Sequence, residues 1–275
     1  MKISIVTSFP FPDGKATANR VKVFADELLK SSCIDSVEVF CCSCDSSSSY
    51  LMDNSLRVTN LKVDPIDKNR LFMRTLCELF MAFRLWRQAR VSCADLTLIS
   101  LPSMLFLVPL VLNPRKFRIA LDLRDAVWTY FGPGLFPRLA EKLLLTLFKV
   151  AAKRAEIISV TNTEEFEQIK HVLGYPPLLV SNGISEKKLD EMQSIKWQSS
   201  SALTRLTYIG NVGIAQELDQ LIDFSRDISD LMITIVGDGA KLEALKRKCE
   251  YDNVSNVFFF GACPGYRGQG LYRLS

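Results

Sequence analysis

Short hydrophobic runs alternate along the chain with longer segments in which apolar residues recur at helical spacing. We interpret the short runs as strands, at 3–6, 37–40, 95–100, 118–123, 157–161, 178–181, 206–209, 232–236 and 256–260. The longer segments are predicted helices, one from near Thr17 and others at 66–92, 103–112, 137–154 and 164–173, and after 213 and 239. The serine-rich stretch 44–49 is predicted to be a loop. Strands that alternate with helices are typical of a parallel sheet with crossover helices, so the predicted fold class is α/β.

Two of the predicted strands end in glycine loops. The strand at 206–209 runs into Gly210-Asn211-Val212-Gly213, and the strand at 232–236 runs into Gly237-Asp238-Gly239. Glycine at a strand end lets a ligand approach the backbone, and the following helix offers unpaired N–H groups to an anion. A phosphate-bearing ligand is one interpretation, and glycine that only makes the turn is an equal alternative. The chain has neither a GxxxxGK[ST] phosphate loop nor a clean GxGxxG motif, which argues against a nucleoside triphosphatase and a standard dinucleotide enzyme.

The run YIGNVGIAQELDQLI, followed by IVGDGAKLEAL, resembles the start of the donor-binding domain of family-4 retaining glycosyltransferases. These enzymes have two Rossmann-like domains, an arrangement called the GT-B fold. The similarity is greatest to bacterial transferases that build O-antigen and capsule polysaccharides, which carry G-N-x-G-x-A-Q-x-L-D and V-G-D-G runs here. The resemblance implies that the donor phosphates bind at Gly210, Asn211, Gly213, Gln216, Gly237 and Gly239. Many relatives have a basic pair where this chain has Asn211 and Gln216, a change that the O-antigen subgroup tolerates.

The N-terminal strand, the loop that contains Gly14 and the helix that reads A-N-R-V also resemble this family. The resemblance implies that Gly14 and the backbone N–H groups after it lie at the cleft, near the donor phosphates or the acceptor. From the residues alone, the same loop is equally an ordinary connection between a strand and a helix.

Arg124 and Asp125 follow the predicted strand at 118–123. Charged side chains at the carboxyl end of a parallel strand lie where such folds bind ligands. Related transferases carry His-Asp or an acidic variant at this place, so the resemblance implies that Asp125 orients sugar hydroxyls. The alternative is an Arg124–Asp125 or Asp122–Arg124 ion pair that only fixes the loop.

The resemblance also predicts where the domains of the chain begin and end. A-x-x-I-I-S-V-T followed by V-S-N-G-I is similar to the end of the first domain, so an N-terminal Rossmann-like acceptor-side domain is expected over 1–182. A polar linker is expected at 183–200, and a partial nucleotide-sugar-binding domain at 201–275. The second domain of this family usually has roughly 150 to 200 residues, whereas this chain has about 75 from Ser201 to Ser275. The E-x7-E segment that holds the donor in the family has no counterpart here, so the chain is expected to be C-terminally truncated.

Composition fits a globular enzyme. The chain has 275 residues, of which 48% are hydrophobic and 23% charged, enough for a large core and two domains. The net charge of +4 does not require a nucleic acid partner, and none is expected. The longest apolar run is interrupted by prolines, and the N-terminus does not resemble a signal peptide, so a cytoplasmic protein is expected.

Two of the predicted helices are rich in basic residues. Over 66–92, six basic residues face only two acidic ones, so this helix either lies on the anionic inner face of a membrane or covers the sheet with its charges in water. In the helix at 137–154, the residues expected to face inward are Leu139, Leu143, Leu144, Leu147 and Phe148. The residues expected to face outward are Lys142, Lys149, Lys153 and Arg154.

The eight cysteines and the single histidine, His171, show no zinc-ligand spacing, so neither a metal nor a cofactor is expected. The cysteines are expected to be reduced, buried, small apolar residues. A lone histidine on a helix is more often a surface residue than a catalyst.

The resemblance implies an enzyme that moves a sugar from a nucleoside-diphosphate sugar to a lipid-linked saccharide, with retention of the anomeric configuration. The alternative is a non-catalytic fragment or pseudoenzyme that keeps the fold and a binding role. An epimerase or dehydrogenase is disfavoured, because GxGxxG and a Y-x-x-x-K pair are both missing from the sequence.

Overall fold

The structure is a computed structural model that describes residues 1–12, 16–43, 47–63, 71–101, 104–112, 117–126, 128, 134–183, 189–190, 193–194, 203–213 and 216–261. Its internal contacts divide the chain into two compact units, Met1–Met192 and Gln193–Ser275. The division falls inside the expected linker, 183–200, of which only residues 183, 189–190 and 193–194 are described. The bounds of the linker and of the two domains stay a prediction.

One sheet of eight strands forms the centre of the first unit, in the order β3-β4-β2-β1-β5-β6-β7-β8. Its strands are β1 Lys2–Val6, β2 Ser36–Ser43, β3 Ser48–Asp53, β4 Leu56–Lys62, β5 Leu96–Leu101, β6 Ile119–Leu123, β7 Ile157–Val160 and β8 Leu178–Leu179. Every neighbouring pair is parallel except β3 with β4. All five residues of β6 are buried, as expected for a parallel strand that is covered on both faces.

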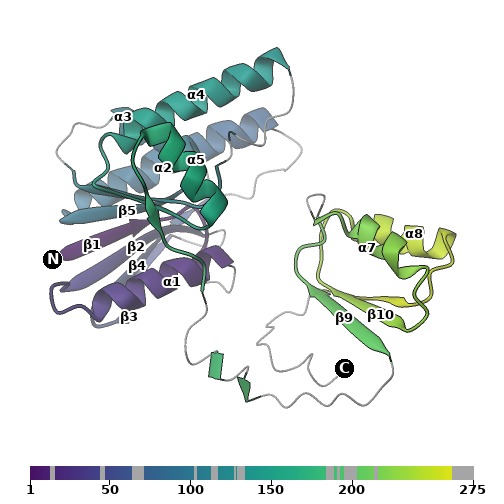
Figure 1. Cartoon of the computed structure of the whole chain (residues 1–275). Helices are drawn as coiled ribbons and strands as arrows, with labels where there is room; N and C mark the ends of the chain where they lie inside the picture. The colour runs from purple at the N-terminus through teal and green to yellow at the C-terminus, as the bar shows by residue number, and fades with distance from the viewer. Residues whose placement is uncertain are drawn as a thin grey trace. The chain divides into compact units, whose positions relative to one another are not determined.

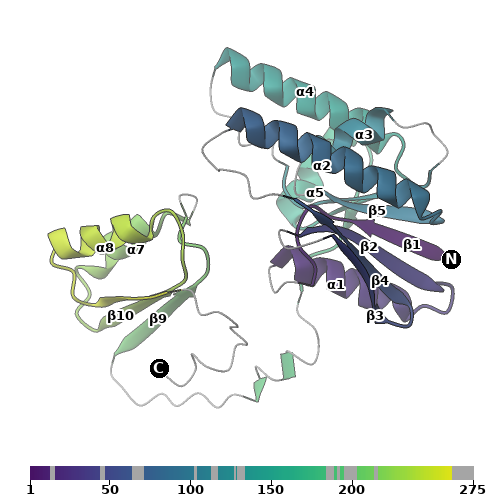
Figure 2. The same ribbon diagram turned by 180° about the vertical axis from the view of Figure 1, so that it is seen from behind.

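Helices cover both faces of this sheet, α1 on one face and α2, α3, α4 and α5 on the other (Figures 1 and 2). The helices are α1 Ala16–Leu29, α2 Leu71–Val91, α3 Leu107–Leu112 preceded by the 3-10 helix η1 Met104–Phe106, α4 Leu135–Ala152 and α5 Thr163–Leu173. Each face has its own apolar core. Ile3 and Ile5 pack toward α1, whereas Val6 and Leu121 pack into the core that contains Phe148 of α4. Side chains of a strand alternate between the faces, so one strand serves both cores.

The second unit is a smaller α/β layer. Its parallel strands lie in the order β11-β10-β9, with β9 Thr204–Ile209, β10 Leu231–Val236 and β11 Val257–Phe260. Helices α7 Leu218–Ser225 and α8 Leu242–Tyr251 lie on the same side of this sheet (Figure 1). Ile222, Ile233, Ile235 and Leu245 are buried between the sheet and the two helices.

The predicted strands and helices are found with small shifts at their ends, but the prediction for 44–49 is wrong in part. Ser48 and Ser49 begin β3, which pairs with β4, and neither strand was predicted. β3 lies at the edge of the sheet, and its residues Tyr50 to Met52 are exposed. An edge strand that faces water does not need the apolar pattern from which strands are predicted. Residues 44–46 lie outside the described part of the chain.

The predicted orientation of α4 also needs correction. The helix begins at Leu135, before Pro137, and Leu139 and Leu143, which were expected to face inward, are 55% and 60% exposed. Leu135, Leu139 and Leu143 are four residues apart, so they share one line along the helix, away from the buried line through Phe148 and Ala152. Arg154 was expected to face outward, but its Nη1 donates hydrogen bonds to the carbonyl oxygens of Leu110 and Val111, at 2.9 and 2.7 Å.

The cysteines are only partly buried. Cys41, Cys42 and Cys249 are buried and Cys77 is half-buried, whereas Cys33 and Cys93 are exposed because they lie in turns at the sheet surface. Cys44 and Cys263 lie outside the described residues. His171 is exposed in the last turn of α5, as expected. Within the described residues, no helix combines the length and the apolar content that a membrane span requires.

Candidate functional site

A row of buried polar residues crosses the sheet of the first unit near the carboxyl ends of its strands. Ser100 of β5 is in register with Asp122 of β6, and Asp122 is in register with Ser159 of β7. Thr7 continues the row, since it follows Val6, the partner of the residue before Ser100. All four are at most 4% exposed and lie on the face that α1 covers. Polar groups at this depth need hydrogen-bond partners.

Arg20 of α1 supplies the main partner. Its Nε and Nη2 donate to Oδ2 and Oδ1 of Asp122 at 2.9 and 2.7 Å, and Ser159 Oγ donates to the same Oδ1 at 2.8 Å. The side chains of Arg20 and Asp122 are 5% and 0% exposed. Nη1 of Arg20 also donates to Oδ1 of Asn182 at 3.2 Å, and the guanidinium lies 4.8 Å from the centre of the Phe24 ring. One arginine therefore connects α1, β6 and the end of the first predicted domain.

Sequence reasoning missed this arrangement. Arg20 is part of the A-N-R-V motif, but its partner lies 102 residues further along the chain, and no local pattern connects the two. Asp122 accepts hydrogen bonds from Arg20 and Ser159, a pairing that the predicted Asp122–Arg124 alternative did not include. The available signal was a charged residue inside a strand that is otherwise apolar, because such a residue needs a buried partner.

Arg124 and Asp125 lie together directly after β6, as the sequence indicated. Arg124 is half-buried, and this burial lowers the pKa of its guanidinium, while the nearby carboxylates of Asp122 and Asp125 oppose the effect. Asp125 is exposed, so its carboxylate is open to a ligand. Thr161 Oγ1 lies 3.3 Å from the carbonyl oxygen of Arg124 and 2.8 Å from Oε2 of Glu165. The start of α5 therefore fixes the backbone that presents the charged pair.

Glu165 is a second buried charge beside this loop. Burial raises the pKa of its carboxyl, and hydrogen bonds from Thr161 partly offset that effect. The backbone N–H of Thr161 donates to Oε2 at 3.2 Å, and the Asn162 side chain accepts from the Glu165 backbone N–H at 2.8 Å as the N-cap of α5. Sequence reasoning did not select Glu165, because one carboxylate in the first turn of a helix is ordinary.

The glycine loops of the second unit pack directly against each other. The N–H of Gly210 donates to the carbonyl of Val236 at 3.0 Å, and the N–H of Val212 donates to the carbonyl of Asp238 at 2.9 Å. A Cβ on Gly237 would lie 1.8 Å from the carbonyl oxygen of Gly210, and the φ of Gly237 is 153°. A Cβ on Gly239 would lie 2.3 Å from the carbonyl oxygen of Val212. Close backbone approach is therefore sufficient reason for glycine at 237 and 239.

Two further donors of the first loop converge on Gln216. The N–H of Gly213 donates to Oε1 of Gln216 at 3.1 Å, and Nδ2 of Asn211 donates to the same oxygen at 3.4 Å. An amide oxygen that accepts from two donors occupies the position that an anionic oxygen would take. A phosphate at this place requires the Gln216 side chain to move, after which both donors can turn to the anion.

The structure brings the predicted residues together in two separate groups. Arg124 and Asp125 are neighbours in the first unit, and Gly210, Asn211, Gly213, Gln216, Gly237 and Gly239 are neighbours in the second. Gly14 lies outside the described residues. Among the side chains that the structure describes, none form a cluster of three or more potential metal ligands.

Comparison with known proteins identifies the architecture. The sequence matches no protein-family model and no curated protein. The solved structure of sucrose-phosphate synthase from Thermosynechococcus elongatus matches 95% of this chain and 70% of its own, with a TM-score of 0.67 and 15% identity. The chain has the GT-B fold.

Two further GT-B structures agree with this result. WaaG, described as a glycosyltransferase involved in lipopolysaccharide biosynthesis, matches 99% of this chain and 72% of its own, with a TM-score of 0.59 and 12% identity. HepE from Anabaena, solved in complex with UDP, matches 96% of this chain and 70% of its own, with a TM-score of 0.58 and 14% identity. The predicted fold class, α/β with two Rossmann-like domains, is confirmed. At these identities the similarity establishes the fold alone.

Proposed function

We propose that this chain is a glycosyltransferase that moves a sugar from a nucleoside-diphosphate sugar to a lipid-linked saccharide. The observation that carries the proposal is the exposed Asp125 beside Arg124 at the carboxyl end of β6, in a chain with the GT-B fold. Open α/β sheets bind ligands at the carboxyl ends of their strands. HepE and Arabidopsis starch synthase IV, which share this fold, were solved with UDP and with ADP and acarbose, respectively, and this supports a nucleotide-sugar donor.

Each charged group has a role in the proposed reaction. Asp125 accepts hydrogen bonds from sugar hydroxyls and orients the sugar. The guanidinium of Arg124 places a positive charge beside it. Negative charge develops on the leaving diphosphate, where Gly213 N–H and the Asn211 amide become donors once Gln216 has moved. Gly210, Gly237 and Gly239 hold the loop, and we place Gly14 near the donor phosphates or the acceptor. We propose retention of the anomeric configuration, with neither a metal nor a cofactor.

The resemblance of the glycine runs supports a biological setting. We propose that the enzyme acts in the synthesis of bacterial O-antigen or capsule polysaccharide, as a cytoplasmic protein at the inner face of the membrane. Its partners are then the nucleotide sugar and the lipid-linked acceptor, without nucleic acid.

The second candidate is a non-catalytic protein that keeps the fold and a binding role. One observation favours it. The N–H groups of Gly210, Val212 and Gly213 already donate to acceptors of the protein itself, so the loop offers a diphosphate few free donors. A donor site of this kind binds weakly unless the Gln216 side chain is displaced.

The test measures nucleotide binding and sugar transfer with the whole chain. Calorimetric titration with UDP, GDP and ADP is expected to detect binding of one of these nucleotides to the chain. Asn211→Ala/Gln216→Ala is expected to change its affinity at least about fivefold, because both side chains line the loop. The control is Gln220→Ala, a glutamine of the neighbouring helix that bonds Glu217.

The same proteins are then assayed for transfer. Asp125→Asn is expected to lower the transfer rate about a hundredfold with an unchanged melting temperature, because the sugar loses its orienting carboxylate. The control is Asp26→Asn on the exposed face of α1. If the chain binds none of the three nucleotides and transfers no sugar, the glycosyltransferase proposal fails and the non-catalytic candidate is favoured. If Asp125→Asn transfers sugar at the normal rate, the proposed role of Asp125 is wrong.

A further inference from the structure

Helix α2 exposes a line of large apolar side chains on the side turned away from the sheet. The exposed residues recur three or four positions apart and are 39 to 65% accessible to water: Met73, Leu76, Phe80 and Phe83. The opposite side of the helix is buried in the core: Ala82, Leu85, Trp86 and Ala89. Further along the exposed side, Arg84 and Arg87 follow, and the exposed Val91 ends the helix. Four large apolar groups on one helix surface are more than a water-facing helix needs.

Helix α4 has the same character. Leu135, Leu139 and Leu143 form an exposed line and are 55 to 71% accessible. The exposed positions between and beyond them are mainly basic: Arg138, Lys142, Lys149 and Lys153. Every large apolar residue on this outer surface therefore has a cation close to it in the helix.

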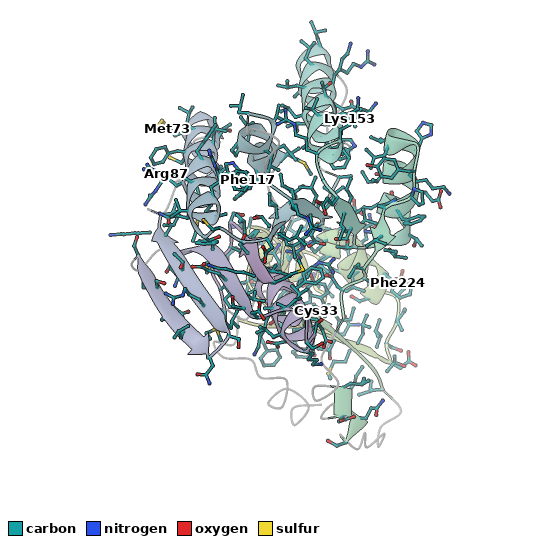
Figure 3. The ribbon with its side chains drawn as sticks, turned by 90° about the vertical axis from the view of Figure 1, so that its left-hand side faces the viewer. Cys33, Met73, Arg87, Phe117, Lys153 and Phe224 are labelled. Atoms are coloured by element: carbon teal, nitrogen blue, oxygen red, sulfur yellow. The ribbon has the colours of Figure 1, made fainter. Side chains whose placement is uncertain are left out.

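The two helices lie on the same face of the sheet. α3 contacts both of them, and Figure 2 shows α2 and α4 extending side by side over that face. Each begins after the carboxyl end of a strand, α2 after β4 and α4 after β6. Their apolar N-terminal halves therefore lie toward the same end of the sheet as Asp125, which also follows β6. Figure 3 labels Met73 and Arg87, two exposed residues of α2.

The charge of these helices identifies the kind of partner. α2 and α4 together contain seven basic and two acidic residues, a net charge of +5, whereas the whole chain has +4. No carboxylate of the described part of the chain pairs with Arg87, Lys142, Lys149 or Lys153. Protein interfaces are depleted in lysine, whereas apolar side chains interleaved with lysine and arginine are typical of helices that lie in the headgroup region of a bilayer.

We propose that the exposed sides of α2 and α4 form a lipid-docking surface that binds an anionic bilayer. The leucine, phenylalanine and methionine side chains enter the boundary between headgroups and acyl chains, and the arginine and lysine side chains contact the lipid phosphates. The proposal deepens the proposed function, on which it rests for its purpose, because it brings a lipid-linked acceptor to the end of the sheet that carries Asp125. Its test does not involve sugar transfer, so either proposal can fail alone.

Vesicle flotation of the whole chain is the test. The vesicles contain phosphatidylcholine alone, or phosphatidylcholine and phosphatidylglycerol in equal parts. The chain is expected to float only with the anionic vesicles, and to be released at about 1 M salt, where the screening length falls to about 3 Å. Lys142→Glu/Lys149→Glu and Leu139→Gln/Leu143→Gln are each expected to weaken binding about tenfold or more, since each removes one of the two contributions.

Matched controls lie on the other face of the same sheet. Lys22→Glu and Val23→Gln change an exposed lysine and an exposed valine of α1, and both are expected to bind vesicles as the unmodified chain does. Circular dichroism checks that every variant is folded. The proposal is wrong if the unmodified chain stays unbound at low salt, if it binds neutral and anionic vesicles equally, or if Lys22→Glu weakens binding as much as the α4 variants. Self-association that Leu139→Gln/Leu143→Gln abolishes, without lipid binding, would assign the surface to a second copy of the chain.

Discussion

The ion pair between Arg20 and Asp122 is buried inside the first unit. Both groups are almost inaccessible to water, and Asp122 accepts hydrogen bonds from Arg20 and Ser159. A buried pair of this kind contributes little net stability when it is complete. Removing one partner is costly, because the other remains as an uncompensated buried charge.

Arg20→Met is therefore expected to lower the free energy of unfolding by about 3 to 5 kcal/mol, measured by urea denaturation. The control is Arg118→Met. Arg118 also binds a carboxylate with two nitrogens, that of Glu156, but these side chains are 56% and 44% exposed. That change is expected to cost much less, because water screens an exposed ion pair. Equal losses in the two variants would show that burial does not set the cost.

Glu165 makes the stability of the first unit depend on pH. Burial raises the pKa of its carboxyl above the ordinary value of 4.5, so the folded state binds this proton more tightly than the unfolded state does. Stability from this group is complete below pH 4.5 and is lost as the pH rises through the folded pKa. Measured by denaturant midpoints, the unmodified chain is expected to lose stability relative to Glu165→Gln as the pH rises above 4.5.

Glu164→Gln is the control for this titration. Glu164 precedes Glu165 in the same helix turn but is exposed. Its replacement removes an exposed carboxylate from the same turn, so it reports the effect of losing a surface charge and not a buried one. A profile for Glu165→Gln that runs parallel to that of the unmodified chain would contradict the raised pKa.

The residues of the candidate site differ in how far sequence could reveal them. Arg124 and Asp125 were found because their position depends only on the strand before them, which is a local pattern. Arg20, Ser159 and Asn182 were missed because their partners come from other elements, and only the sheet register brings them together. The predicted roles of Arg124 and Asp125 stay predictions.

At the scale of elements, the sequence shows where the glycine loops are but not why they contain glycine. The sequence located both loops correctly but left a phosphate site and a simple turn as equal alternatives. The structure adds a third explanation for the glycines. The backbone N–H groups of Gly210 and Val212 bond the other loop segment, and no room is left for a Cβ at Gly237. The exposed lines of α2 and α4 were hidden for a similar reason. Helical spacing gives the lines along a helix but not which of two apolar lines is buried.

Gly237→Ala tests the packing of the loops. The new Cβ would meet the carbonyl oxygen of Gly210, a backbone atom that cannot move alone, in a backbone conformation that side chains rarely adopt. The free energy of unfolding of the second unit is expected to fall by at least about 2 kcal/mol in urea. Gly261→Ala is the control in the same unit, because its Cβ would meet nothing within 4 Å. A loss in the control as large as that in Gly237→Ala would contradict the packing argument.

At the scale of the whole molecule, the alternation of strands and helices predicted the α/β class, and the resemblance of the two glycine runs to family-4 glycosyltransferases implied the GT-B fold. The strand order was not predictable from the same pattern. It places β1 between β2 and β5, and it depends on pairing between strands far apart in sequence. The hairpin of β3 with β4 was missed for the same reason, since its edge strand is identified by its neighbour and not by its own residues.

The two units have separate apolar cores. The clusters around Ile5 and Leu121 lie in the first unit, and the cluster around Ile233 lies in the second. A unit with its own core can unfold on its own, so scanning calorimetry of the whole chain is expected to show two transitions. Arg20→Met is expected to lower the midpoint of one transition, and Gly237→Ala that of the other, because each variant damages one core. A single transition that both variants lower would show that the units unfold together, and the two stability losses would then have to be assigned to one cooperative structure.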